Sequence, residues 1–545
     1  MKKININSFK PHVLAILLFI VISMVYLWPL LEGKRLEQGD IKNFAGMSKE
    51  IADYRESTGK EALWTNRMFS GMPAYQISVI YKTNFISFYD KAIKLFLPHP
   101  AGLVFLYFLG FYILLLVLGF DKRLGILGAI AFAFSSYFFI ILDAGHNSKA
   151  NAIGYMAPVI AGIILTFNGR LWLGGALTAV FLALEINANH LQITYYLALA
   201  IIILGIVEFI SKYKEKELKK FFSASGVLII ALILSIGTNI ANLWATSEYV
   251  QDSTRGKSEL TAHNENKTSG LDKDYATDWS YGKMESFTLL IPNYMGGSST
   301  TELSKNSNTN KLLKESGIPN SEKYIKNLPT YWGDPIFTSG PVYAGAIIVF
   351  LFILGLFIVK GKYKWWLLST VILSLFLAWG RNMMWFTDVF FDFVPGYNKF
   401  RSVSMTLVIA ELCIPLLAML ALKNIFDDEI PKKDKIKSFK YAGIITLGIL
   451  IIFGFLAGSF LDFVSPNDAQ TAKMYLNYGF PEGFMAAIQS DRPGMLTADT
   501  FRSLIFIVLA ASVIWLYISN KLKNVTIVIA ILSALVIIDM WTIDK

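Results

Sequence analysis

The chain has 545 residues, of which 54% are hydrophobic and 14% aromatic, and its apolar residues come in long runs. Runs of about 20 residues suit a helix that crosses a bilayer, since every backbone polar group must then bond within its own segment. The composition excludes a soluble globular protein, and the lack of alternating runs of about ten residues excludes a closed β-barrel. A formal net charge of +10 is explained by lysines at an anionic membrane surface, so we expect no nucleic-acid partner.

Thirteen apolar segments predict an all-α polytopic membrane protein. In chain order they are 12–31, 101–120, 124–142, 152–167, 171–186, 190–210, 222–244, 341–359, 365–379, 403–422, 441–461, 503–519 and 525–541. The first is interpreted as an uncleaved helix rather than a signal peptide, because no small-residue cleavage site follows it and more spans come later.

The distribution of Lys and Arg predicts the orientation of these helices. With a cytoplasmic N-terminus, the inner segments carry 22 basic residues and the short outer loops carry 7. Because cytoplasmic loops are enriched in Lys and Arg, we expect a multi-pass protein of the bacterial cytoplasmic membrane with its N-terminus inside.

Three outer segments, 32–100, 245–340 and 462–502, are too long to be simple connectors, and long loops often carry function. In the first, 49–54 and 63–69 have the pattern of short helices at the membrane interface. In the second, the Ser-, Asn- and Lys-rich stretch 298–327 is expected to be mobile.

The spans and long loops divide the chain into three parts. These are an N-terminal membrane module (1–244), a long outer loop (245–340) and a C-terminal membrane module (341–545). The first part also contains the outer loop 32–100.

Two polar clusters follow apolar segments that should end on the same side of the membrane. The first holds Glu37 and Asp40, and the second holds Asp143, His146 and Lys149. Carboxylates just outside the bilayer, opposite a His and a Lys, suit an enzyme that acts on a lipid-linked substrate with its phosphate at headgroup depth.

Several short motifs occur in a consistent order along the chain. They are Gly39-Asp40, Gly145-His146-Asn147-Ser148-Lys149, His190-Leu191-Gln192-Ile193-Thr194-Tyr195-Tyr196, Pro292-Asn293-Tyr294, Tyr331-Trp332-Gly333-Asp334-Pro335 and Tyr397-Asn398-Lys399-Phe400-Arg401. Together they resemble the YfhO family of bacterial membrane proteins, which is similar in architecture to the GT-C glycosyltransferases. The resemblance covers essentially the whole chain. It implies a GT-C-like bundle with long extracytoplasmic loops.

The resemblance also implies a reaction. A sugar would pass from a polyprenyl-phosphate donor to a cell-envelope glycopolymer or glycolipid outside the membrane. The acid of the first outer loop would be the catalytic base, which is Asp40 here, with Glu37 as a weaker candidate. The alternative for Asp40 is an N-cap of a helix beginning near Ile41, because Asp is a favoured cap.

The second cluster is assigned to substrate binding. Asp143 and His146 are three residues apart, so on a helical turn both could hold a divalent cation, Mg²⁺ or Mn²⁺, or the donor phosphate. Lys149 would act as a point charge on phosphate, or would only extend to the interface. Glu285 is a further candidate metal ligand.

The remaining substrate-binding candidates are aromatic, amide or basic residues at outer helix ends. They are His190, Gln192, Tyr195, Arg381, Lys399 and Arg401. The basic residues would hold a phosphate by charge-assisted hydrogen bonds. The alternative is that all six only anchor the helices at the interface.

Other classes of function lack their signatures. The chain has no P-loop, dinucleotide fingerprint, zinc-binding His-Glu-x-x-His or nucleophile elbow, and its single Cys413 lies within an apolar run. A transporter or flippase remains the rival, because residues 154–158 interrupt a helix with Gly and Pro. A third possible function is that of a scaffold for partners in the cell envelope. Family members often continue into a soluble outer domain, so we expect a longer natural chain.

Overall fold

The computed structural model describes residues 9–256 and 269–544, and its chain divides into two compact units. Unit 1 comprises Met1–Ala129, Ile141–Lys273 and Gly396–Phe400. Unit 2 comprises Ile130–Ile140, Asp274–Pro395 and Arg401–Lys545. The boundaries of these units differ from the three-part division expected from the sequence, because the expected central loop 245–340 is divided between the two units at Lys273.

Unit 1 is built almost entirely of helices. They are α1 (Lys10–Tyr26), α2 (Gly39–Thr58), α3 (Ile86–Ile93), α4 (Ala101–Val117), α7 (Asn147–Phe167), α8 (Leu171–Asn187), α9 (Leu191–Lys214), α10 (Leu218–Thr238) and α11 (Ile240–Val250). α5 (Lys122–Ala133) and α6 (Ser136–Ala144) each run across a boundary between the units. Two short antiparallel strands, β1 (Trp64–Thr65) and β2 (Met72–Pro73), pair Trp64 with Pro73.

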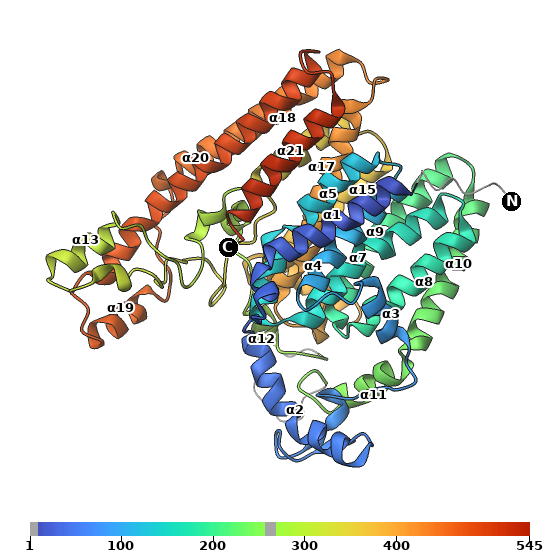
Figure 1. The fold of residues 1–545 in the computed structure, drawn as a ribbon, viewed down its shortest axis with the longest axis horizontal. Helices are drawn as coiled ribbons and strands as arrows, with labels where there is room; N and C mark the ends of the chain where they lie inside the picture. The colour runs from blue at the N-terminus through green and yellow to red at the C-terminus, as the bar shows by residue number, and fades with distance from the viewer. Residues whose placement is uncertain (1–8, 257–268, 545) are drawn as a thin grey trace. The chain divides into compact units, whose positions relative to one another are not determined.

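Helix α7 is at the centre of the unit 1 bundle. It packs against α4 and α8, while α10 packs against the other side of α8 (Figure 1). Beyond Asn151, α7 is apolar on all sides, which is the pattern of a helix buried among others. The close approach of α7 and α8 needs small residues, since a methyl group added at Gly162 would lie 2.7 Å from the backbone nitrogen of Thr178.

Unit 2 contains the other helices. They are α12 (Lys273–Thr277), α13 (Asn308–Glu315), α14 (Ala346–Ile358), α15 (Lys362–Ala378), α16 (Met384–Phe393), α17 (Leu407–Phe426), α18 (Lys432–Ile449), α19 (Asp468–Asn477), α20 (Phe484–Ile518) and α21 (Val525–Trp541). α12 begins at the last residue of unit 1. α14 packs between α17 and α18. The long helix α20 contacts α13 and α21 (Figure 1).

Short 3₁₀ helices connect these elements. They are η2 (Trp28–Glu32), η3 (Ala74–Gln76), η4 (Met284–Leu289), η5 (Pro292–Met295), η6 (Ser321–Lys323), η7 (Gly380–Met383), η8 (Tyr397–Lys399), η9 (Val403–Thr406) and η11 (Ala457–Ser459). One π-helical segment, η10 (Leu450–Phe455), continues α18.

The prediction of an all-α membrane protein is confirmed. Among the described residues, six helices are long and apolar enough to cross a membrane, or up to eight if each of two bent pairs is one span. Five further apolar helices have 10–17 residues. Each of the thirteen predicted segments contains helix, so thirteen crossings stay a prediction.

Several local predictions were wrong. Residues 49–54 belong to the single long helix α2, and residues 63–69 contain strand β1 instead of a helix. α7 runs unbroken through Gly154 and Pro158, since neighbouring helices surround it. The stretch 298–327 is folded, because its few apolar residues pack together with the start of α20. That cluster consists of Leu303, Leu313, Ile325, Leu328, Phe484, Met485 and Ile488.

Candidate active site

The two polar clusters singled out in the sequence meet in unit 1. Oδ2 of Asp40 lies 3.1 Å from Nε2 of His146. Nζ of Lys149 lies 3.2 Å from Nδ1 of the same ring. Because an ammonium only donates and a carboxylate only accepts, Nδ1 accepts from Lys149 and Nε2 donates to Asp40. The imidazole is therefore held as one tautomer between a cation and an anion.

Two helix starts and a glycine bring this array together. Asp40 lies in the first turn of α2, where a carboxylate interacts favourably with the helix dipole. His146 immediately precedes α7, and Lys149 is in its first turn. Gly145 has a φ of +92° and passes close to the Cβ atoms of Gln38 and Asp40. The alternative that Asp40 is an N-cap is wrong, because Gln38 is the residue before the first turn.

Burial keeps the histidines of this region neutral. Burial and the ammonium of Lys149 lower the pKa of His146, while Asp40 opposes that shift. Burial, together with Lys149, lowers the pKa of His190 to about 3. Nδ1 of His190 is buried and has no hydrogen-bond partner among the described residues. Both rings are thus uncharged at neutral pH, and His146 uses both of its ring nitrogens in the array.

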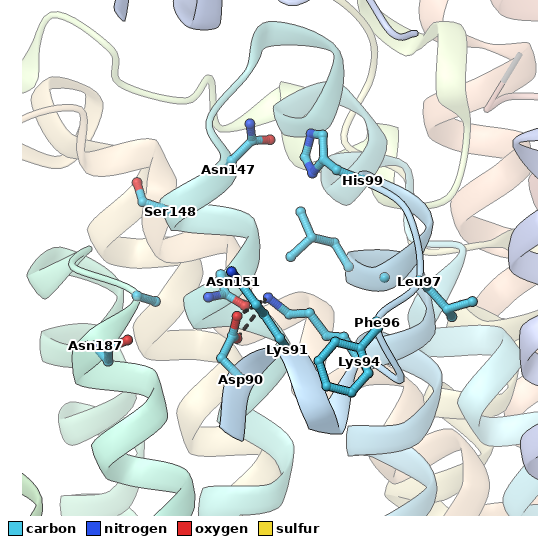
Figure 2. A pocket seen from close by; sticks show the side chains of 13 residues that line it. Asp90, Lys91, Lys94, Phe96, Leu97, His99, Asn147, Ser148, Asn151 and Asn187 are labelled. Atoms are coloured by element: carbon cyan, nitrogen blue, oxygen red, sulfur yellow. Dashed lines mark hydrogen bonds and ion pairs between the residues drawn. The ribbon is translucent and has the colours of Figure 1, made fainter. Parts of the chain in front are cut away.

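An open pocket of about 480 Å³ lies beside this array, wholly within unit 1. Its polar lining includes Asp90, Lys91, Lys94, His99, Asn147, Ser148, Asn151 and Asn187. Figure 2 shows His99 and Asn147 on one side of the pocket, with the joined side chains of Asp90 and Lys94 on the other. Lys94 Nζ lies 2.8 Å from Asp90, which also accepts a 2.8 Å hydrogen bond from the hydroxyl of Tyr155.

Gln38 connects the acid-bearing helix to this pocket. Its side-chain amide donates to Asn147 Oδ1 at 3.1 Å, and its carbonyl accepts from Asn147 Nδ2 at 3.2 Å. The same carbonyl lies 3.2 Å from Nε2 of His99. Only 4% of Gln38 is exposed. The residue two positions before Asp40 is therefore fixed against two side chains that line the pocket.

The other members of the two clusters are more exposed. Glu37 forms an ion pair with Lys42 at the surface. Asp143 is exposed at the end of α6. In the described ranges, no group of three or more His, Cys, Asp or Glu side chains comes together, so the cation assigned to Asp143 and His146 stays a prediction.

Two candidates in the first turns of α9, and Lys399, have partners within unit 1. Gln192 donates to the hydroxyl of Tyr196 at 2.8 Å. The ring of Tyr195 packs against Phe400, with centroids 5.2 Å apart. The ammonium of Lys399 donates to the carbonyls of Arg255 and Ser269 at 2.8 and 2.6 Å. These contacts hold 396–400 on unit 1.

Three candidates belong to unit 2, where each contacts neighbouring groups. Arg381 donates to the carbonyl of Thr277 at 3.1 Å, and Arg401 donates to the hydroxyl of Tyr275 at 2.6 Å. Glu285 accepts from the hydroxyl of Tyr331 at 2.6 Å, and burial raises the pKa of this carboxyl to about 7. Phosphate or metal binding by these three residues stays a prediction.

Sequence reasoning missed most of the pocket lining. Asp90 and Lys94 have the i, i+4 spacing of a helical ion pair, which was a detectable signal. Gln38, which contacts the lining residues His99 and Asn147, lies inside the acidic cluster and carries no charge that would single it out. His99 and Asn151 carry no local pattern, so only the tertiary structure identifies them.

The chain matches no family model, no curated protein and no solved structure. The chemistry of the site is therefore argued from its own residues.

Proposed function

We propose that this chain is a GT-C-like glycosyltransferase of the YfhO type. It transfers a sugar from a polyprenyl-phosphate donor to a cell-envelope glycopolymer or glycolipid, outside the bacterial cytoplasmic membrane. In this proposal thirteen helices cross the membrane and the N-terminus is cytoplasmic. The observation that carries the proposal is the Asp40–His146–Lys149 array beside an open pocket with two further lysines.

Asp40 is the base in the proposed reaction. The acceptor hydroxyl oxygen attacks the anomeric carbon of the donor sugar, and its proton passes to the Asp40 carboxylate. The bond between the anomeric carbon and the phosphate oxygen breaks, and polyprenyl phosphate leaves with the electron pair. A phosphate is already a good leaving group, so no acid of raised pKa is needed.

His146 and Lys149 position and tune that carboxylate. The Nε2–H donated by His146 fixes one Asp40 oxygen, so the other points to the acceptor. The buried ammonium of Lys149 holds the ring from its other side. Both are positioning residues for the base, and Lys149 adds a positive charge next to Ser148, which lines the proposed phosphate site.

The pocket is the proposed site for the donor phosphate. Lys91 and Lys94 line one part of it, and Asn147 and Ser148 bring the first turn of α7 to another. A helix N-terminus with nearby lysines favours an anion. Both ring nitrogens of His146 are already engaged, so no step is assigned to a divalent cation.

The test is turnover of polyprenyl-phosphate sugars in membranes, followed as release of polyprenyl phosphate. Asp40→Asn should reduce release by about 10²- to 10⁴-fold, which is the usual contribution of a general base. Asp53→Asn is the matched control, since Asp53 lies on the same helix and pairs with Lys49 at the surface. Equal release by both variants would show that Asp40 is not the base.

The rival functions make a different prediction. A transporter, flippase or envelope scaffold would release no polyprenyl phosphate from any donor of a broad panel, although the chain is folded. α7 runs unbroken, so the helix that favoured transport is not a broken one, and the features that still support transport are the two bent helix pairs. The polar array and its pocket support transfer. We therefore place the transferase first.

A further inference from the structure

A second pocket of about 540 Å³ lies in unit 1 and has a different chemistry. It is formed by α2, the segment after β2, the end of α8 and the junction of α10 with α11. The described residues that line it include no Lys, Arg, His, Asp or Glu. Its polar groups are mainly amides, among them Gln76, Asn187, Asn189 and Asn242, and two tyrosines, Tyr75 and Tyr81.

The amides are held in place by one another. Asn242 Nδ2 donates to Asn189 Oδ1 at 2.9 Å. Asn187 Nδ2 donates to Asn239 Oδ1 at 3.3 Å. A side-chain amide has two donor hydrogens and an acceptor oxygen, so the bond between Asn242 and Asn189 uses only part of the capacity of these two groups. Asn239 is fixed more firmly, because its Nδ2 also donates to the carbonyls of Ala183 and Ser235 at 3.0 and 3.1 Å. The pocket therefore presents oriented donors and acceptors without charge.

This lining selects one class of ligand. Phosphates and carboxylates are bound most strongly by Arg or Lys with charge-assisted hydrogen bonds. Two helix starts, those of α3 and α11, contribute Ser87 and Asn242 to the lining, but none of the described residues that line this pocket is charged. Hydroxyl groups both donate and accept, as the amides do. The tyrosine rings add flat apolar faces that can pack against C–H groups while their hydroxyls bond. An uncharged, polyhydroxylated molecule fits all three properties.

The two pockets share a residue. Asn187, the last residue of α8, lines the uncharged pocket and also the pocket that contains Lys91 and Lys94. A ligand in the uncharged pocket thus borders the proposed donor site. The helix that carries Asp40 also contributes Phe44 to the uncharged pocket.

We infer that the uncharged pocket binds the sugar units of a neutral glycan and that this glycan is the acceptor. Its identity as acceptor rests on the proposed transferase function, whereas binding itself does not. A neutral sugar chain held by Asn189 and Asn242 would place a hydroxyl toward the shared wall at Asn187.

The experiment measures binding and transfer separately on the purified full chain in lipid nanodiscs. The binding probes are fluorescent chitotetraose and maltotetraose, with a glycerol phosphate oligomer as the charged comparison. Asn189→Ala and Asn242→Ala each remove one amide from the pocket wall and, with it, the hydrogen bond that joins these two side chains. Asn168→Ala is the matched control, because Asn168 is exposed just beyond the other end of α7, about 30 Å from its start.

We expect at least one neutral tetrasaccharide to bind. Each pocket variant should weaken that binding about 3- to 10-fold, which is the effect of one or two lost hydrogen bonds. Asn168→Ala should bind as the unaltered chain does. In the transfer assay, the pocket variants should raise KM for the acceptor and leave KM for the donor unchanged.

The two proposals fail in different ways. If neither tetrasaccharide binds, or if the folded pocket variants bind as tightly as Asn168→Ala, the glycan site is overturned even where transfer is observed. Preferred binding of the glycerol phosphate oligomer would also overturn it. If the variants weaken binding as expected but no donor is turned over, the glycan site stands and the transferase proposal fails.

Discussion

Replacing Gly145 with alanine is expected to displace Asp40 while leaving every side chain of the array in the chain. A methyl group at Gly145 would lie 3.1 Å from Cβ of Gln38 and 3.2 Å from Cβ of Asp40. Carbon atoms pack best at about 3.5–4.0 Å, so the start of α2 must move by about half an ångström. That movement lengthens the contact between Asp40 and His146.

The magnitude follows from comparing two glycines. Gly145 has a φ of +92° and Gly169 a φ of +89°, and nothing lies within 4 Å of a methyl group added at Gly169. Alanine at either position is strained by about 1–2 kcal/mol, but only Gly145→Ala also pushes on Asp40. A misplacement of about 1 Å can reduce catalysis about 100-fold, so we expect about tenfold for half that distance.

The assay is release of polyprenyl phosphate, measured beside thermal unfolding of the same preparations. Both variants should unfold at reduced temperatures because they carry the same backbone strain, and Gly145→Ala should unfold at the lower temperature of the two because it also displaces the start of α2. Gly145→Ala alone should lose about tenfold in kcat/KM, which corresponds to about 1.4 kcal/mol of transition-state stabilisation. Equal kcat/KM for the two variants would refute the reasoning that the position of Asp40 controls the reaction.

Two further predictions concern the stability of unit 1. The pKa of His190 is about 3 in the folded protein, against an ordinary value of 6.5. Between these two pH values the unfolded chain binds the proton and the folded chain does not, so the stability of the protein falls as the pH drops from 6.5 toward 3. His190→Gln should therefore flatten the fall in Tm between pH 7 and pH 5, and an unchanged slope would contradict the assignment. Asp90→Asn leaves the ammonium of Lys94, whose side chain is 14% exposed, without its carboxylate, and should destabilise the protein by about 3–5 kcal/mol. Adding Lys94→Met removes that ammonium and should restore part of the lost Tm. A double variant less stable than Asp90→Asn would show that the unpaired ammonium of Lys94 is not the cause of the destabilisation.

The sequence was a good guide where the signal is local. Apolar runs and turn residues predicted a helix in each of the thirteen segments, because backbone bonding within an apolar segment depends on that segment alone. It also brought Asp40 and His146 to the same candidate site, because both follow apolar segments that are expected to end on one side of the membrane. The 3.1 Å contact between them confirms that proximity.

The sequence misled where the outcome depends on distant partners. Residues 63–69 were expected to be helical, yet Trp64 pairs with Pro73 as a strand, and a strand needs a neighbour that its own pattern does not specify. The stretch 298–327 was expected to be mobile, yet a few apolar residues such as Leu313 are buried against α20. Polar composition alone does not reveal such an anchor.

The sequence by itself determined that this is a helical membrane protein with an acid, a histidine and a lysine at one group of helix ends. Only the tertiary structure decided how these groups bond, that Gln38 joins them to a pocket, and that an uncharged amide pocket shares Asn187 with it. The physical reason is how far apart along the chain the interacting residues lie. Helix formation is settled by neighbours along the chain, whereas a pocket is formed by side chains such as Gln76 and Asn242 that meet only when the helices pack.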